Sequence, residues 1–307
     1  MGSRGKRHGG RGGADAPADC AYPWCLFGYF LGIQKVTRPA GRNSTAAERR
    51  NKRKVTPLPR RYIDRIYLRE PVPADSYLSA LPAVRALGDR EHPLLFPADV
   101  TFLVGENGTG KSTLLEAVAV ACGFNAEGGT RNFDFSTRAT HSPLHEYLTV
   151  GRTAYPRDGF FLRAESFYNV ATNIDEMDEA PSFGPRLIDS YGGVSLHDQS
   201  HGESFLALVE HRFGGNGLYL LDEPEAALSP TRMMSLLVLL RNLVKKHSQF
   251  IIATHSPILM AYPGACIYQL SEDGIQQVAY RDTEHYQLTR RFLEAPERMI
   301  DLLFREE

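Results

Sequence analysis

The stretch that decides the fold reads Gly105-Glu106-Asn107-Gly108-Thr109-Gly110-Lys111-Ser112-Thr113 and fits the pattern G-x-x-x-x-G-K-S of a phosphate-binding loop. An apolar, β-rich run, Val100–Val104, precedes it, and Leu114–Cys122 follows with the composition of a helix. A loop of this kind turns its backbone N–H groups inward, and the following helix adds the positive end of its dipole. The sequence therefore predicts a binding site for the phosphates of a nucleoside triphosphate.

The residue types inside this loop have separate expected tasks. Its glycines permit backbone turns that a side chain would hinder. Lys111 is expected to reach the β- and γ-phosphates, and the Ser112 hydroxyl to hold Mg²⁺. Thr113 is available for another phosphate oxygen. The loop thus predicts a nucleotide together with a divalent cation.

A second motif is an apolar run that ends in carboxylates, Gly217-Leu-Tyr-Leu-Leu-Asp-Glu-Pro-Glu225. A continuous apolar run is typical of a parallel strand covered on both faces, and α/β sheets place their chemistry at the carboxyl ends of such strands. Asp222 is therefore expected to hold Mg²⁺, and Glu223 to orient or deprotonate an attacking water. Together with the loop, this pair predicts hydrolysis of the nucleotide.

Two further segments complete a recognisable order of motifs. Ser200-His-Gly-Glu-Ser204 precedes the carboxylates at the start of an apolar run, and Ala253-Thr-His-Ser-Pro257 follows the strand-like run Gln249–Ala253. This order resembles that of the ABC-type ATPases. It is most similar to their soluble branch, which contains the SMC and recombination-repair heads and stand-alone AAA-family ATPases. The resemblance covers roughly residues 60–307.

The resemblance implies a fold and a mechanism. The implied fold is α/β: a P-loop NTPase with a doubly wound, mainly parallel sheet, an antiparallel β lobe in residues 124–158 and a short helical lobe. The implied activity is hydrolysis of ATP with Mg²⁺ at the interface of a homodimer that holds two nucleotides between its heads.

Individual residues match the motifs of this family. Ser200 and Gly202 match the signature segment that caps ATP bound to the other subunit, although His201 stands where the family has glycine. His255 matches the switch histidine that contacts the γ-phosphate, and it joins Glu223 as an expected catalytic residue.

Two positions depart from the family pattern. No glutamine follows the strand-like run Phe160–Arg163, and Glu165 or Ser166 stands there, either as a substitute or as a plain turn residue. Ser229 replaces an aspartate in the loop after the Asp-Glu strand, which is expected to weaken signalling between subunits.

The amino-terminal part differs in composition from the rest. Residues 1–54 hold twelve Lys/Arg against three Asp/Glu and lack apolar periodicity, so we expect a disordered basic extension before an ATPase domain at 55–307. An arm that binds nucleic acid or a partner is the alternative. The apolar run Cys20–Ile33 is too short for a membrane span, which needs about 20 residues. No disulfide framework is visible among the cysteines, which favours the cytoplasm.

The sequence leaves three functions open. The segment between Arg163 and Ser200 is too short for SMC-type coiled-coil arms and looks short for the lobe with which transporter ATPases grip a membrane partner. A free-standing ATPase is therefore the main expectation. The alternatives are the ATP-binding subunit of a transporter, or a DNA-associated regulatory module switched by ATP with little turnover.

Overall fold

The structure, a computed structural model, describes residues 61–131, 142–165, 167–179 and 186–305. The predicted extension 1–54 lies outside these ranges, as does Ser166, so the expectations for both stay predictions.

A six-stranded sheet lies at the centre of the fold, with the strand order β5-β6-β7-β3-β8-β9. The neighbouring pairs from β5 to β8 are parallel, and only β8 and β9 pair antiparallel. The three middle strands β6, β7 and β3 are buried at every position, as expected of continuous apolar runs. The strands are β5 (Asp158–Arg163), β6 (Gly217–Asp222), β7 (Gln249–Ala253), β3 (Val100–Gly105), β8 (Cys266–Ser271) and β9 (Gly274–Gln277).

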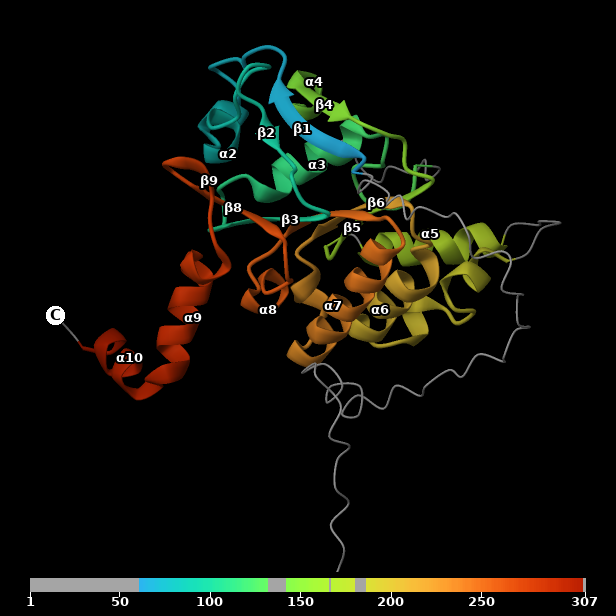
Figure 1. Cartoon of the computed structure of the whole chain (residues 1–307). Helices are drawn as coiled ribbons and strands as arrows, with labels where there is room; N and C mark the ends of the chain where they lie inside the picture. The colour runs from blue at the N-terminus through green and yellow to red at the C-terminus, as the bar shows by residue number, and fades with distance from the viewer. Residues whose placement is uncertain (1–60, 132–141, 166, 180–185, 306–307) are drawn as a thin grey trace, which may run out of the picture. The chain divides into compact units, whose positions relative to one another are not determined.

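Helices cover both faces of this sheet, so the fold is doubly wound as predicted (Figure 1). Neighbouring residues of β3 point to opposite faces, and each joins a different core. Phe102 packs in the core beneath α5, α6 and α7, whereas Leu103 packs in the core beneath α3. The four long helices of these two layers are α3 (Lys111–Ala121), α5 (Phe167–Glu179), α6 (His201–Arg212) and α7 (Pro230–Lys245).

A small antiparallel sheet lies on the α3 side, with the order β2-β1-β4. Its strands are β2 (Leu94–Leu95), β1 (Ile63–Leu68) and β4 (Leu148–Arg152). The predicted antiparallel lobe is therefore present, but only β4 comes from residues 124–158. The other two strands, β1 and β2, precede the phosphate loop. β1 therefore pairs with β4 across a long stretch of chain, from Ile63 opposite Arg152 to Leu68 opposite Leu148.

One buried amide ties the small sheet to the large one. The Oε1 atom of Gln249 accepts hydrogen bonds from the backbone N–H groups of Tyr62 (2.7 Å) and Ile63 (2.9 Å), and its Nε2 donates to the Ile63 carbonyl (2.8 Å). Gln249 is almost fully buried at the start of β7. A buried amide without these partners would be costly, so the contact fixes β1 against the central sheet.

The carboxyl-terminal part begins with the β8–β9 hairpin, in which Ser271 pairs with Gly274, and two helices follow. They are α9 (Glu284–Glu294) and α10 (Pro296–Leu303). No helix among the residues that the structure describes is long and apolar enough to cross a membrane. The shorter helices are η2 (Tyr77–Ala80), α2 (Pro82–Arg85), α4 (Leu144–Tyr147), η3 (Leu187–Tyr191), η4 (Leu196–Asp198), η5 (Pro224–Ala227), α8 (Pro257–Met260) and η6 (Tyr280–Asp282).

Candidate functional site

The phosphate loop joins the end of β3 to the start of α3. Its three glycines all have positive φ: 149° at Gly105, 84° at Gly108 and 93° at Gly110. A Cβ atom at Gly105 would also come within 2.2 Å of the carbonyl oxygen of Leu270 on the neighbouring strand β8. Glycine is therefore required at Gly105 for space as well as for backbone conformation.

Lys111 lies at the centre of this loop. Its ammonium donates to the carbonyl oxygens of Gly105 (2.8 Å) and Glu106 (2.9 Å), and the side chain is buried. Burial lowers the pKa of Lys111, while the carboxylates of Glu223 and Asp222 act in the opposite direction. The Lys111 ammonium therefore lies inside the loop, where it can donate to a bound anion.

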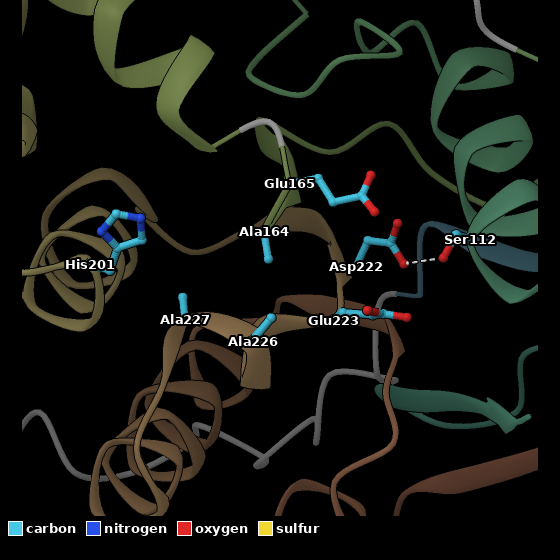
Figure 2. A pocket seen from close by; sticks show the side chains of 8 residues that line it. All are labelled: Ser112, Ala164, Glu165, His201, Asp222, Glu223, Ala226 and Ala227. Carbon is cyan, nitrogen blue, oxygen red and sulfur yellow. Dashed lines mark hydrogen bonds between the residues drawn. The ribbon is translucent and has the colours of Figure 1, made fainter. Parts of the chain in front are cut away.

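Ser112 and Asp222 meet although 110 positions separate them in the sequence. The hydroxyl of Ser112, at the start of α3, donates to Oδ1 of Asp222, at the end of β6, over 2.9 Å (Figure 2). Burial raises the pKa of Asp222 to about 6, and the neighbouring Arg163 opposes this shift. A hydroxyl and a carboxylate side by side offer the hard oxygen ligands that Mg²⁺ prefers, so these residues fit the predicted cation.

Glu223 follows Asp222 in a left-handed backbone conformation, with φ 49° and ψ 51°. Non-glycine residues rarely adopt it, and such strain concentrates at functional sites. The backbone N–H of Glu223 donates to the carbonyl of Ala253 at the end of β7 (3.0 Å), which holds the turn in place. Its carboxylate Oε1 lies 3.5 Å from Nε2 of His255. The residues predicted to be catalytic, Glu223 and His255, therefore lie together.

A pocket of about 190 Å³ opens beside these groups (Figure 2). Glu165, one of the two residues predicted at the place of the family glutamine, lines it with a largely exposed carboxylate. The imidazole of His201 lines the opposite end, away from Asp222. The lining residues are Ser112, Ala164, Glu165, His201, Asp222, Glu223, Ala226 and Ala227.

Arg163 is a site residue that the motifs did not indicate. Its guanidinium lies 2.7 Å from Oε2 of Glu116, 3.5 Å from Oδ2 of Asp222 and 3.6 Å from Oε2 of Glu165. It therefore bridges the phosphate-loop helix and the Asp-Glu strand with a half-buried positive charge. A charged residue at the carboxyl end of the apolar strand β5 was the available signal, because the parallel pairing places Arg163 opposite Asp222.

The signature segment lies at the amino-terminal end of α6, where Ser200 is the capping residue. The carboxylate of Glu203 accepts from the Ser200 N–H (3.2 Å) and from its hydroxyl (2.5 Å). Arg232, also missed from the sequence, donates to both Ser200 (3.2 Å) and Glu203 (2.9 Å). A Cβ atom at Gly202 would approach Nη1 of Arg232 to 2.4 Å. This network fixes the helix start, and Ser200 does not line the pocket beside Asp222.

Ser229 has a local structural role. Its hydroxyl oxygen accepts from the backbone N–H of Arg232 (3.4 Å) and caps α7. Serine is a good capping residue, so the substitution for the family aspartate keeps the cap.

His255 has one more neighbour that the sequence did not indicate. Its Nδ1 lies 2.9 Å from Nε2 of His285, in the first turn of α9. The backbone N–H of His255 donates to the carboxylate of Glu225.

Two family models match the chain. Residues 83–155, which include the phosphate loop, match a model described as "AAA domain". Residues 189–261, which include the signature segment, the Asp-Glu strand and His255, match a model described as "AAA domain, putative AbiEii toxin, Type IV TA system". No curated protein matches the chain in sequence.

The chain is also similar to several solved structures. One is the SMC head domain from Thermotoga maritima, with 18% identity and a TM-score of 0.36, covering 71% of this chain and 98% of that one. A second is cbiO1 from Clostridium perfringens, described as part of the ABC transporter complex cbiONQ, with 18% identity, a TM-score of 0.44 and coverage of 79% and 98%. A third is a nucleotide-free ATP-binding cassette from an ABC transporter, with 19% identity, a TM-score of 0.44 and coverage of 77% and 98%.

The phosphate loop, the Asp-Glu strand and the two AAA-domain models fall on the same parts of the chain. The chain is an ATP-hydrolysing P-loop enzyme, as its motifs predict.

Proposed function

We propose that the chain hydrolyses Mg·ATP with Glu223 as general base, in a homodimer that encloses two nucleotides. The observation that carries this proposal is the convergence of Ser112, Asp222 and Glu223 at one edge of the sheet, next to Lys111 inside the loop. α/β folds bind ligands at this carboxyl edge of their strands.

In this proposal the chain's own groups hold the nucleotide. The backbone N–H groups from Glu106 to Thr113 and the Lys111 ammonium bind the β- and γ-phosphates. The oxygens of Ser112 and Asp222, now 2.9 Å apart, are the ligands for the cation. Bound Mg²⁺ would supply charge neutralisation on the phosphate oxygens. Arg163 offsets the negative charge of Asp222 from the opposite side.

Glu223 and His255 have separate roles in hydrolysis of the γ-phosphate. The carboxylate of Glu223 is partly exposed at the pocket and can accept the proton of an attacking water. His255 Nε2, 3.5 Å from Glu223, is the donor proposed for the γ-phosphate.

The homodimer is proposed from the position of the signature segment. Ser200 and Gly202 lie at the amino-terminal end of the twelve-residue helix α6, and Ser200 is exposed. A helix amino terminus attracts anions. Because Ser200 is absent from the pocket beside Asp222, we assign it to the γ-phosphate held by a second copy of the chain.

Light scattering across nucleotide states tests the dimer. The Glu223→Gln form is expected to shift from monomer to dimer with Mg·ATP and to stay monomeric with ADP. Adding Ser200→Arg should block this shift while ATP still binds the monomer. Gln276→Arg, an equal change of charge on the exposed strand β9, is the control that should dimerise normally. A mass that is independent of nucleotide would refute the two-headed arrangement.

Turnover separates this proposal from the two alternatives predicted from the sequence. A free-standing ATPase is expected to hydrolyse ATP without membrane protein or DNA. Hydrolysis that appears only when DNA is added would favour the DNA-associated module.

A further inference from the structure

His255 and His285 form a close pair of rings. The Nδ1 atom of His255 and the Nε2 atom of His285 are 2.9 Å apart, and the ring centroids lie 5.0 Å apart with 62° between the planes. His255 follows β7 and His285 belongs to α9, so two distant segments meet at this contact. A distance of 2.9 Å between ring nitrogens requires a hydrogen on one of them.

The first turn of α9 is held firmly against the sheet. Thr283 is fully buried; its hydroxyl donates to the carbonyl of Tyr280 (2.8 Å) and accepts from the N–H of Tyr286 (3.4 Å). The N–H of Glu284 donates to the side-chain oxygen of Gln269 in β8 (3.2 Å). This hydrogen bond connects the residue before His285 to β8, which pairs directly with the phosphate-loop strand β3.

The pKa values of both rings lie below the ordinary value for histidine, which favours the neutral forms at neutral pH. Burial lowers the pKa of His255, and the positive charge of Lys111 acts in the same direction, against the carboxylates of Glu223 and Glu106. Burial also lowers the pKa of His285, which faces Glu106, Lys111 and Glu284. Each neutral imidazole carries one hydrogen, so the contact has a defined donor.

The unpartnered nitrogens identify that donor. Among the described residues, Nδ1 of His285 and Nε2 of His255 are both buried without a hydrogen-bond partner, but Nε2 of His255 lies 3.5 Å from a carboxylate oxygen of Glu223. A hydrogen on Nδ1 of His285 would leave a buried N–H without an acceptor, which native structures rarely tolerate, whereas a hydrogen on Nε2 of His255 faces that carboxylate. The hydrogen of His285 is therefore assigned to Nε2, which donates to Nδ1 of His255. This assignment places the hydrogen of His255 on its own Nε2, the atom that faces Glu223.

We propose that His285 is a positioning residue: it holds His255 as the Nε2–H tautomer, so that this N–H is directed to the γ-phosphate site. The proposal rests on the proposed function, in which His255 Nε2 donates to the γ-phosphate. It also makes the first turn of α9 part of the ATPase site, although no motif of the nucleotide-binding region includes it.

Steady-state kinetics on the full chain test the catalytic part. His285→Ala is expected to lower kcat about tenfold, the effect of one orienting hydrogen bond, with the KM for ATP changed less than about twofold. His285→Gln, whose amide can donate to the same acceptor, should restore most of kcat. Thr289→Ala, an exposed position one turn further along α9, is the matched control and should behave as the unaltered chain does.

Nitrogen NMR of labelled histidine tests the tautomer without turnover, with His255→Gln used to assign the signals. The Nε2–H form of His255 is expected in the unaltered chain and in His285→Gln, and a mixture of both tautomers in His285→Ala. An unchanged tautomer in His285→Ala, or equal losses of kcat in the Ala and Gln variants, would overturn the proposal. Failure of the proposed function is seen separately, as unchanged turnover in Glu223→Gln with the histidine signals intact.

Discussion

The phosphate loop and the signature segment are built by different means. The loop is fixed by buried groups, since Lys111 and Asp222 are both enclosed and find their partners inside the same edge of the sheet. The signature segment is fixed on the surface, where Ser200 is held by Glu203 and Arg232. One half of the site is thus organised by the chain's own core, whereas the other half presents a helix end to whatever lies outside. This difference agrees with the proposed site between two subunits.

Lys111→Ala, in the phosphate loop, is expected to have the largest effect. ATP binding is expected to disappear, because the variant loses the only cation enclosed by the loop. Titration with a labelled ATP analogue measures the effect. Lys245→Ala, at the exposed end of α7, is the control and should bind normally. Near-normal affinity in Lys111→Ala would remove the phosphate-loop assignment.

Glu223→Gln tests the chemistry rather than the binding. The amide keeps the shape but accepts no proton, so turnover is expected to fall by about 10²–10⁴-fold while ATP still binds. Glu210→Gln, an exposed carboxylate on α6, serves as the control. If turnover persists, the proton acceptor is another group, and Glu165 or His255 becomes the residue to test.

The same contrast explains how much could be read from the sequence. The loop and the carboxylates at Asp222 and Glu223 form contiguous patterns at strand ends, and the local pattern is sufficient to place them. Arg163, Arg232 and His285 escaped prediction because each acts through contacts with residues remote in the sequence. No periodicity or spacing marks such a contact before the strand order and helix packing are known.

The small antiparallel sheet next to α3 could also be predicted only in part from the sequence. β1 precedes the phosphate loop, but its partner β4 lies beyond the phosphate-loop helix. Apolar alternation predicts that a strand exists, whereas its neighbours depend on tertiary packing. The small sheet is antiparallel as predicted, but two of its three strands lie outside residues 124–158, where the lobe was expected.

A smaller effect is expected at the carboxyl-terminal end of α6, opposite the signature segment. Asp158 accepts from Arg212 (2.8 Å), Tyr219 (2.7 Å) and the N–H of Gly214 (2.9 Å). Asp158→Asn is expected to lower the free energy of unfolding by about 3 kcal/mol, because it leaves the charge of Arg212 without its carboxylate. Chemical denaturation measures this value, and Glu210→Gln again provides the control.

The pH dependence of stability sharpens that test. Burial acts to raise the pKa of Asp158, but the Gly214 N–H, the Tyr219 hydroxyl and Arg212 outweigh it, so the pKa lies below its ordinary value. The stabilisation is then present above the unfolded-state pKa of about 3.9 and is lost as the pH falls through the folded-state pKa. The melting temperature of the unaltered chain should fall in this acidic range, and Asp158→Asn should fall less. Equal slopes would show that this carboxylate does not anchor α6.

Removing residues 1–54 is expected to have the smallest effect, and it tests whether the two halves of the site are complete without that segment. Its twelve Lys/Arg against three Asp/Glu and its lack of apolar periodicity give it little to contribute to a core. The melting temperature and the ATPase rate of the shortened chain should match those of the full chain. A marked drop in melting temperature would instead show that the apolar run Cys20–Ile33 packs on the ATPase domain. A change in the ATPase rate alone would indicate that residues 1–54 act on the signature segment. The residues around the phosphate loop already find their partners within residues 105–255.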